Sequence, residues 1–148
     1  MEDETLPAIV TLHKYFIWSN RMRTHFDKIL EASKKEQEKK KFDIESLMYL
    51  SLWYATLYTV IEGWKELKLQ DPKIDFFLQS PNVENLKKYR NGVLHFQRNY
   101  FDQRFLGMIT SQDSVSWVRE LNSEFGRYFL DWYREQRDQQ GQEVRKQT

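Results

Sequence analysis

The chain of 148 residues carries a net charge of +1 and no cysteine, and 16% of its residues are aromatic and 30% charged. This length and composition exclude a disordered chain and predict one folded domain with a sizeable core. The missing cysteines exclude disulfides, thiolate metal sites and cysteine nucleophiles and fit a reducing cytoplasm, while the near-neutral charge does not by itself predict a nucleic-acid partner.

The first part of the chain predicts a long helix from about Leu6 to about Lys40. Its start is acidic and has no signal-peptide pattern, and the chain holds no apolar run long enough to span a membrane. One face of this helix carries Ile9, His13, Phe16, Ile17 and Asn20. We interpret the charged stretch 34–41 as a solvated helix end, with an RNA-facing basic patch as the alternative.

A second helix is predicted from Asp43, as its N-cap, to about Leu69. It is apolar nearly all round, which is typical of the central helix of a bundle. One narrow strip differs and contains Ser51, Ala55, Tyr58 and Glu62. This strip is either a packing seam, with Glu62 paired or at its edge, or a polar strip that faces a functional site. Gly63 indicates the close approach of another element.

The rest of the chain predicts three further helices. Asp71 and Pro72 begin a short one that ends near Gln79, and Ser80 and Pro81 begin the next. Residues 98–107 are predicted to be irregular, held to the core by Tyr100, Phe101 and Phe105. A last helix follows, capped by Thr110 or Ser111 with Thr110 and Asp113 as a capping box, and it ends near Gln139.

These elements predict an all-α fold, an up-and-down bundle of about five helices. Residues 1–140 form the domain, and the polar tail 141–148 is expected to fray. In the last helix the residues predicted to face inward are Val115, Val118, Leu121, Phe125, Phe129, Trp132 and Tyr133.

The helix expected after Ser80 has an arginine in its apolar stripe. Val83, Leu86, Val93 and Leu94 share this stripe, and Arg90 lies in the middle of it. Because an unpaired buried guanidinium is costly, Arg90 is expected to meet a carboxylate, a phosphate or a second copy of the chain.

A histidine follows on the same helix. Asn91 and His95 are four residues apart and are expected to stack on a neighbouring face. Arg90 and His95 lie about 140° apart around the helix, so they either reach across it or act from different chains.

The pattern of Arg90, Asn91, three residues and His95 resembles the motif of the HEPN superfamily. The apolar helix before it, residues 52–64, also resembles the helix that precedes the motif in that family, and the resemblance extends from about Leu47 to Gln97. HEPN domains are helical bundles that commonly dimerise, and many are metal-independent endoribonucleases of toxin–antitoxin, antiviral or RNA-processing systems. In one toxin subgroup a tyrosine two residues after the histidine is modified by a partner enzyme, and Gln97 stands at that position here.

The resemblance implies a homodimer that cleaves RNA, with catalytic Arg90, Asn91 and His95 from two chains in one cleft, no metal and no cofactor. An antitoxin or effector protein is the further partner that it implies. The residue types suit this chemistry, because histidine transfers protons near neutral pH and arginine binds phosphate through two N–H groups. The basic residues expected to hold the RNA backbone are Lys87, Lys88, Arg98 and Arg104, and those expected beside the site are Tyr58, Glu62 and Gln97.

Two alternatives remain open for this sequence. The chain is either a non-catalytic HEPN scaffold or regulatory partner, or an unrelated helical interaction protein in which the motif arises by chance. A dimer with both motifs in one basic cleft would favour the nuclease, and a dimer that buries His95 would favour the scaffold. A monomer in which Arg90 pairs with its own Glu62 would favour the unrelated protein.

Overall fold

The computed structural model describes residues 6–34 and 42–147 and contains helices but no strand in these ranges. The helices are α1 (Ala8–Ser33), the π-helical segment η2 (Phe42–Ser46), α3 (Leu47–Glu66), α4 (Pro72–Phe77), α5 (Asn82–Leu94), α6 (Gln103–Thr110) and α7 (Ser114–Gln147). The predicted all-α class is therefore confirmed. Within the described ranges, no helix combines the length and the hydropathy that crossing a bilayer requires.

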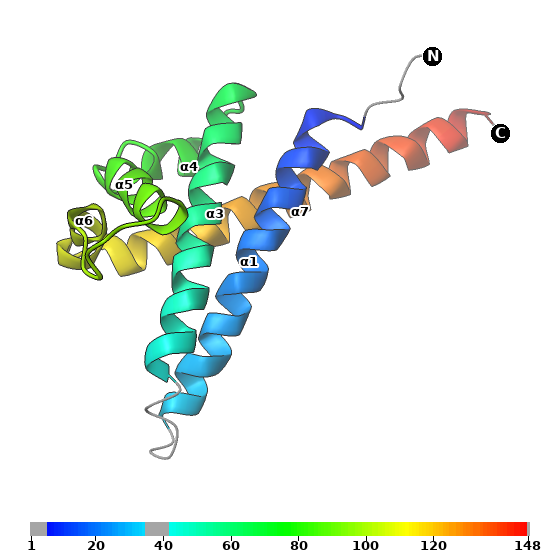
Figure 1. Cartoon of the computed structure of the whole chain (residues 1–148). Coiled ribbons are helices and arrows are strands. Elements are labelled where there is room, and N and C mark those ends of the chain that lie inside the picture. Colours follow the sequence, from blue (N-terminus) through cyan, green and yellow to red (C-terminus); the bar gives the residue numbers. More distant parts are fainter. Residues whose placement is uncertain (1–5, 35–41, 148) are drawn as a thin grey trace, which may run out of the picture.

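The helix α3 is the centre of the bundle, as predicted. Figure 1 shows α1 alongside it, the group α4, α5 and α6 on its other side, and α7 running across both α1 and α3. The buried residues of α3 are Trp53, Tyr54, Ala55, Leu57, Tyr58, Val60, Ile61 and Trp64. A helix that is covered from several directions must be apolar on several faces, which explains the sequence pattern.

Close contacts join α3 to α1 and to α7. A Cβ atom added at Gly63 would lie 2.4 Å from Leu12 Cδ1, so the predicted close approach at this glycine is confirmed. On α7, the ring of Phe125 lies 5.7 Å from that of Trp64. These contacts place α1 and α7 directly against the central helix.

The start of α3 differs from the prediction. Asp43 lies inside η2 and is not the N-cap, because α3 continues from this π-helical turn with Ser46 in helical geometry and without a side-chain cap. The start of α4 is as predicted, since the Asp71 carboxylate accepts hydrogen bonds from the backbone N–H groups of Lys73 and Ile74. The charged stretch predicted for 34–41 lies outside the described residues, except for Lys34.

The segment predicted to be irregular contains the helix α6. Its first turn is capped by Asp102, which accepts a hydrogen bond of 2.9 Å from the backbone N–H of Arg104. Gly107 lets α6 lie close to α5, because a Cβ atom there would be 2.5 Å from Asn85 Oδ1. A helix of only about two turns around a glycine carries little periodicity, so the pattern did not reveal it.

The last helix starts later and ends later than predicted. Thr110 ends α6 and does not cap α7, which begins at Ser114. The polar tail after Gly141 continues α7 to Gln147 with exposed side chains. Val115 is 63% exposed rather than inward, and Trp117 takes a core position instead. On α1, Ile17 is likewise exposed.

Candidate functional site

Arg90 is held against the central helix by three neighbours. Its Nη1 group forms an ion pair with the carboxylate of Glu62 on α3, and its guanidinium carbon lies 4.6 Å from the ring centre of Tyr58. Its Nε group donates a hydrogen bond of 3.2 Å to Oδ1 of Asn91. The carboxylate expected beside Arg90 is therefore Glu62 of the same chain. Only 20% of the Arg90 side chain stays exposed.

The polar strip of α3 faces α5 along its length. At one end the Ser51 hydroxyl and the Tyr89 hydroxyl are 3.0 Å apart, and at the other end Tyr58 and Glu62 meet Arg90. Burial raises the pKa of Tyr58, the charge of Glu62 adds to the rise, and the charge of Arg90 opposes it. The strip is therefore both a packing seam and the surface that positions Arg90.

His95 lies outside the helix, contrary to the prediction. The helix α5 ends at Leu94, and His95 has extended backbone angles, φ −114° and ψ 129°. Its backbone N–H still donates to the carbonyl of Asn91 at 3.1 Å, but the side chains do not stack on one helix face. Gln97 donates from Nε2 to the His95 carbonyl at 2.9 Å. The imidazole is exposed and contacts no hydrogen-bonding or aromatic partner among the described residues.

Large apolar side chains are exposed on both sides of His95. We call the following residues the His95 patch: Leu94, Phe96, Tyr100, Phe101 and Ile109. Their exposed fractions are 60%, 93%, 71%, 75% and 62%. The prediction that Tyr100 and Phe101 are held in the core is therefore wrong, whereas Phe105 is half-buried with its ring 5.0 Å from that of Tyr89. A cavity of about 140 Å³ lies between the patch and α3, and Tyr100, Phe101 and Ile109 belong to its lining.

Four basic side chains are exposed on the same elements. Lys87 and Lys88 belong to α5, Arg98 to the connection that follows, and Arg104 to α6. None of them forms an ion pair with a residue in the described ranges. The predicted local excess of positive charge is therefore free to attract an anion.

Arg90 and His95 are not brought together within one chain. Arg90 points to α3, whereas His95 is held on the exposed segment that leaves α5. Asn91 is the link between them, since it accepts from the Arg90 side chain and from the His95 backbone. A site that uses both side chains therefore needs either a second copy of the chain or a rearrangement of this segment.

Comparisons with protein-family models, with curated proteins and with solved structures gave no match. No family is assigned to the chain on this basis. The HEPN resemblance stays a prediction that rests on Arg90, Asn91 and His95 and on the helix before them.

The other two histidines belong to the packing of the bundle. His13 is half-buried, with its ring 5.0 Å from Phe129 and 4.9 Å from Tyr133, and burial lowers its pKa. His25 is half-buried, and its ring stacks on that of Tyr49 with the ring centres 5.0 Å apart. Within residues 6–34 and 42–147, no three histidine, aspartate or glutamate side chains gather as a metal site would require.

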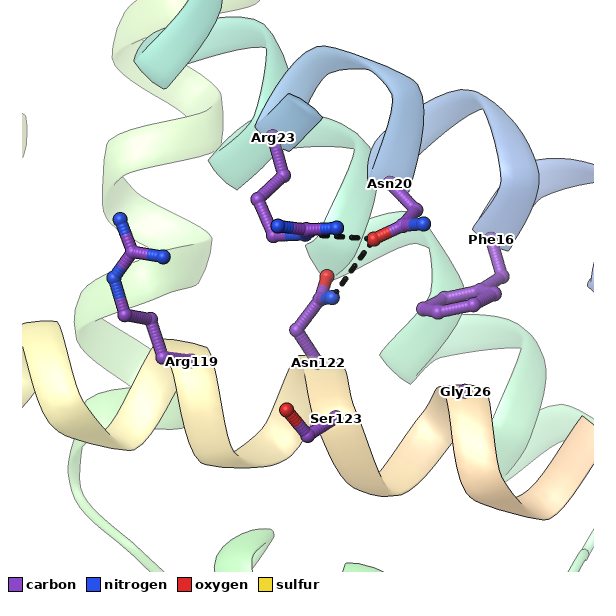
Figure 2. A pocket seen from close by; sticks show the side chains of 7 residues that line it. All are labelled: Phe16, Asn20, Arg23, Arg119, Asn122, Ser123 and Gly126. Carbon is purple, nitrogen blue, oxygen red and sulfur yellow. Dashed lines mark hydrogen bonds between the residues drawn. The ribbon is translucent and has the colours of Figure 1, made fainter. Parts of the chain in front are cut away.

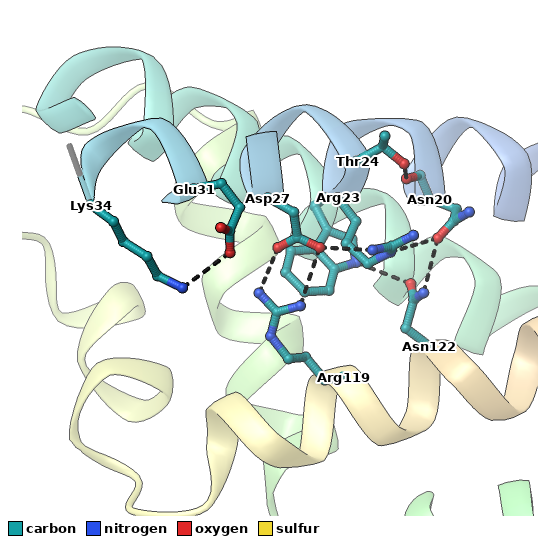
Figure 3. Close-up of polar contacts among 9 residues, drawn as sticks. Asn20, Arg23, Thr24, Asp27, Glu31, Lys34, Arg119 and Asn122 are labelled. Carbon is teal, nitrogen blue, oxygen red and sulfur yellow. Dashed lines mark hydrogen bonds and ion pairs between the residues drawn. The ribbon is translucent and has the colours of Figure 1, made fainter. Parts of the chain in front are cut away.

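A polar cluster between α1 and α7 was missed by the sequence reasoning. The Asp27 carboxylate accepts hydrogen bonds from Arg23 at 2.7 Å and from Arg119 at 2.7 and 3.3 Å. Asn20 and Asn122 continue this cluster toward the core (Figure 3). The spacing of Asn20, Arg23 and Asp27 places them on one side of α1, but their partners are about a hundred positions away in sequence.

Acid is expected to destabilise the protein through Asp27. Burial acts to raise the pKa of Asp27, but the hydrogen bonds and charges of Arg119 and Arg23 outweigh it and lower the pKa below its ordinary value. The folded protein therefore binds this proton less readily than the unfolded chain. The resulting stability is complete at neutral pH and is lost as the pH falls below about 5 and through the lowered pKa.

The melting temperature measured between pH 7 and pH 3 checks this expectation. Asp27→Asn should melt at a lower temperature at pH 7 and should lose less on acidification than the wild type. Asp138→Asn, on the exposed part of α7, serves as the control and should follow the wild-type curve. An unchanged slope in Asp27→Asn would show that other carboxylates govern the acid response.

Proposed function

We propose that the protein is a metal-independent endoribonuclease of HEPN type that acts as a homodimer in the cytoplasm, in a toxin–antitoxin or defence setting. The observation that carries this proposal is the position of His95. Its imidazole is exposed without a side-chain partner among the described residues, between the exposed side chains of Leu94 and Phe96. A histidine that takes part in no packing is available for proton transfer at neutral pH.

The His95 patch supports a dimer at this position. Large exposed apolar side chains that gather on neighbouring segments are typical of protein interfaces, and Phe96 is 93% exposed in the single chain. A two-fold dimer buries the same patch on both copies. If the patches meet, both His95 side chains come to one groove, and the unpaired Lys87, Lys88 and Arg104 are expected at its rim.

Each residue has a role in the proposed reaction. One His95 takes the proton of the RNA 2′-hydroxyl, whose oxygen forms a bond to the adjacent phosphorus while the bond to the 5′-oxygen breaks. The other His95 gives a proton to the leaving 5′-oxygen. Arg90 has its Nη1 and Nε groups engaged by Glu62 and Asn91, which orients the guanidinium and leaves its Nη2 group for the phosphate.

The direct test is RNA cleavage by the purified protein in the presence of EDTA. We expect fragments that end in 2′,3′-cyclic phosphate and begin with a 5′-hydroxyl, because the 2′-hydroxyl is the nucleophile. Single-stranded and hairpin RNAs are both needed, since the contacts proposed here are to the backbone and select little sequence. The absence of cleavage of every RNA, together with no toxicity on expression, would overturn the proposal.

A non-catalytic interaction protein is the second candidate, and the Arg90–Glu62 ion pair favours it. This pair and the contact with Tyr58 fasten α5 to α3, which is a structural role that needs no substrate. It is also the arrangement expected for a monomer in which the motif arises by chance. In that case an antitoxin, an effector or another protein would cover the His95 patch, and the purified chain would be monomeric.

The oligomeric state separates these candidates. Phe96→Asp is expected to raise the dissociation constant of the homodimer at least about 100-fold, because each copy loses a buried aromatic side chain worth about 2 kcal/mol and gains a carboxylate in an apolar interface. Light scattering after size-exclusion chromatography measures this. The matched control is Phe76→Asp on α4, which is 69% exposed and lies outside the patch. A monomeric wild type, or an equal effect of both variants, would contradict the proposed interface.

A further inference from the structure

The cavity beside the His95 patch has the size of an aromatic ring. Its volume is about 140 Å³, and an apolar cavity of about 150 Å³ holds a benzene molecule. The hydroxyl groups of Ser51 and Tyr89 lie 3.0 Å apart and therefore pair with each other. The remaining lining is mainly apolar. The full set of lining residues is Leu47, Ser51, Tyr89, Tyr100, Phe101, Phe105 and Ile109.

The cavity lies between the core and the surface. Tyr89 on its inner side is 3% exposed, whereas Tyr100, Phe101 and Ile109 are 71%, 75% and 62% exposed. The rings of Tyr100 and Phe101 are in edge-to-face contact, with their centres 4.9 Å apart. A side chain that enters the cavity from the surface would therefore meet these three exposed residues first and Tyr89 last.

The groove between α1 and α7 differs, because its polar side chains already bind one another. Figure 2 shows that the Asn20 side-chain oxygen accepts hydrogen bonds from Arg23 at 2.8 Å and from Asn122 at 3.0 Å. The Phe16 ring in the same groove is 6% exposed and stacks on Phe129. These contacts fasten α1 to α7. In the cavity beside the His95 patch, by contrast, apolar side chains face the solvent.

Phe96 has the size and the exposure of an occupant for this cavity. Its exposed fraction of 93% is the largest of any large apolar side chain in the described ranges. Leaving a whole phenyl ring in water is unfavourable compared with burying it. Phe96 and Tyr100 belong to the same connection between α5 and α6, so the exposed ring and the entrance of the cavity are close in the chain.

We propose that the Phe96 ring of each copy inserts into the cavity of a second copy of the chain. The inference rests on the homodimer of the proposed function. A two-fold dimer lets each copy give one ring and receive one. The exposed parts of Phe96, Tyr100 and Phe101 offer about 500 Å² of surface on each copy. A standard interface buries about 800 Å² on each partner, so these three side chains supply more than half of it.

Insertion also brings together residues that one chain keeps apart. His95 directly precedes Phe96, and Tyr89, which lines the cavity, directly precedes Arg90. A Phe96 ring held against Tyr89 therefore moves His95 of one copy toward Arg90 of the other. The second copy would thus complete a site that a single chain leaves divided.

A cavity-filling substitution separates insertion from simple contact between two surfaces. Ser51→Leu fills the cavity from α3 and leaves the exposed patch unchanged, so it should raise the dissociation constant of the dimer at least about tenfold, as should Phe96→Ala. The double variant should dimerise about as weakly as the weaker single variant, because both changes remove the same contact. Ser51→Ala is the matched control: it also loses the hydrogen bond to Tyr89 but leaves the cavity open, and it should dimerise like the wild type.

Analytical ultracentrifugation measures the four dissociation constants against that of the wild type. A wild-type constant in Ser51→Leu or Phe96→Ala, additive effects in the double variant, or an equal loss in Ser51→Ala and Ser51→Leu would overturn the insertion and leave the dimer standing. A monomeric wild type would overturn the insertion and the homodimer together. A failure to cleave RNA would overturn only the nuclease, because this experiment contains no RNA.

A second measurement on the unchanged chain applies if Ser51→Leu does not fold, which circular dichroism would show. Isotope-filtered NMR of mixed labelled and unlabelled wild type detects only contacts between copies. We expect nuclear Overhauser effects between the Phe96 ring of one copy and the Ile109 methyl groups of the other. The absence of these contacts in the dimer would overturn the insertion.

Discussion

Replacing His95 with alanine is expected to abolish RNA cleavage and to leave the fold and the dimer intact. General acid–base catalysis by a histidine contributes about 10²–10⁴-fold to a rate, and both proton transfers in the proposed reaction depend on this residue. The fold should not respond, because the exposed His95 ring contacts no partner among the described residues. The helical signal and the melting temperature should therefore match those of the wild type.

The measurement compares the rates at which wild type and His95→Ala cleave a labelled RNA in EDTA. His25→Ala is the matched control, because His25 stacks on Tyr49 of α3 and lies outside the proposed site. It should cleave at the wild-type rate. Equal activity in His95→Ala and the wild type would remove His95 from the reaction, and the nuclease proposal would lose the observation that carries it.

Replacing Arg90 with alanine is expected to lower the cleavage rate about 10²–10³-fold through the loss of electrostatic stabilisation of the phosphorane. The free energy of unfolding, by contrast, should fall only slightly. The partner carboxylate of Glu62 is 49% exposed, and ion pairs this open to solvent contribute about 0–1 kcal/mol. The cleavage rate of Arg90→Lys should lie between those of the wild type and Arg90→Ala, because lysine keeps the charge but loses the planar arrangement of N–H groups.

Mixing wild type with an excess of His95→Ala tests whether the site is shared between chains. In a heterodimer the groove holds one His95 where the proposed reaction uses two, so the cleavage rate should fall as heterodimers form. A rate that stays in proportion to the amount of wild-type chain, although heterodimers form, would place all the side chains of a site on one chain. If Arg90→Ala lowers the melting temperature and no variant cleaves RNA, Arg90 acts only to fasten α5 to α3.

Several local features of the structure follow directly from the sequence. The apolar surface of α3 predicted the central helix, and Asp71 with Pro72 predicted the start of α4, because periodicity and capping involve residues within one or two turns. The position of Arg90 in an apolar stripe predicted a partner for its charge. The same reasoning failed at α6 and at His95, because α5 ends at Leu94, before the histidine that was predicted to lie on it.

The sequence by itself therefore determined the all-α class, the central helix and the need of Arg90 for an anion, since each depends on local pattern and on the cost of burying charge. Only the tertiary structure decided which anion that is, because Glu62 is 28 residues away in sequence. It also decided that the apolar residues around His95 are exposed, and that Asn20 meets Asn122 at a separation of 102 residues. Such pairings arise when distant helices cross, and no local pattern encodes the place where they meet.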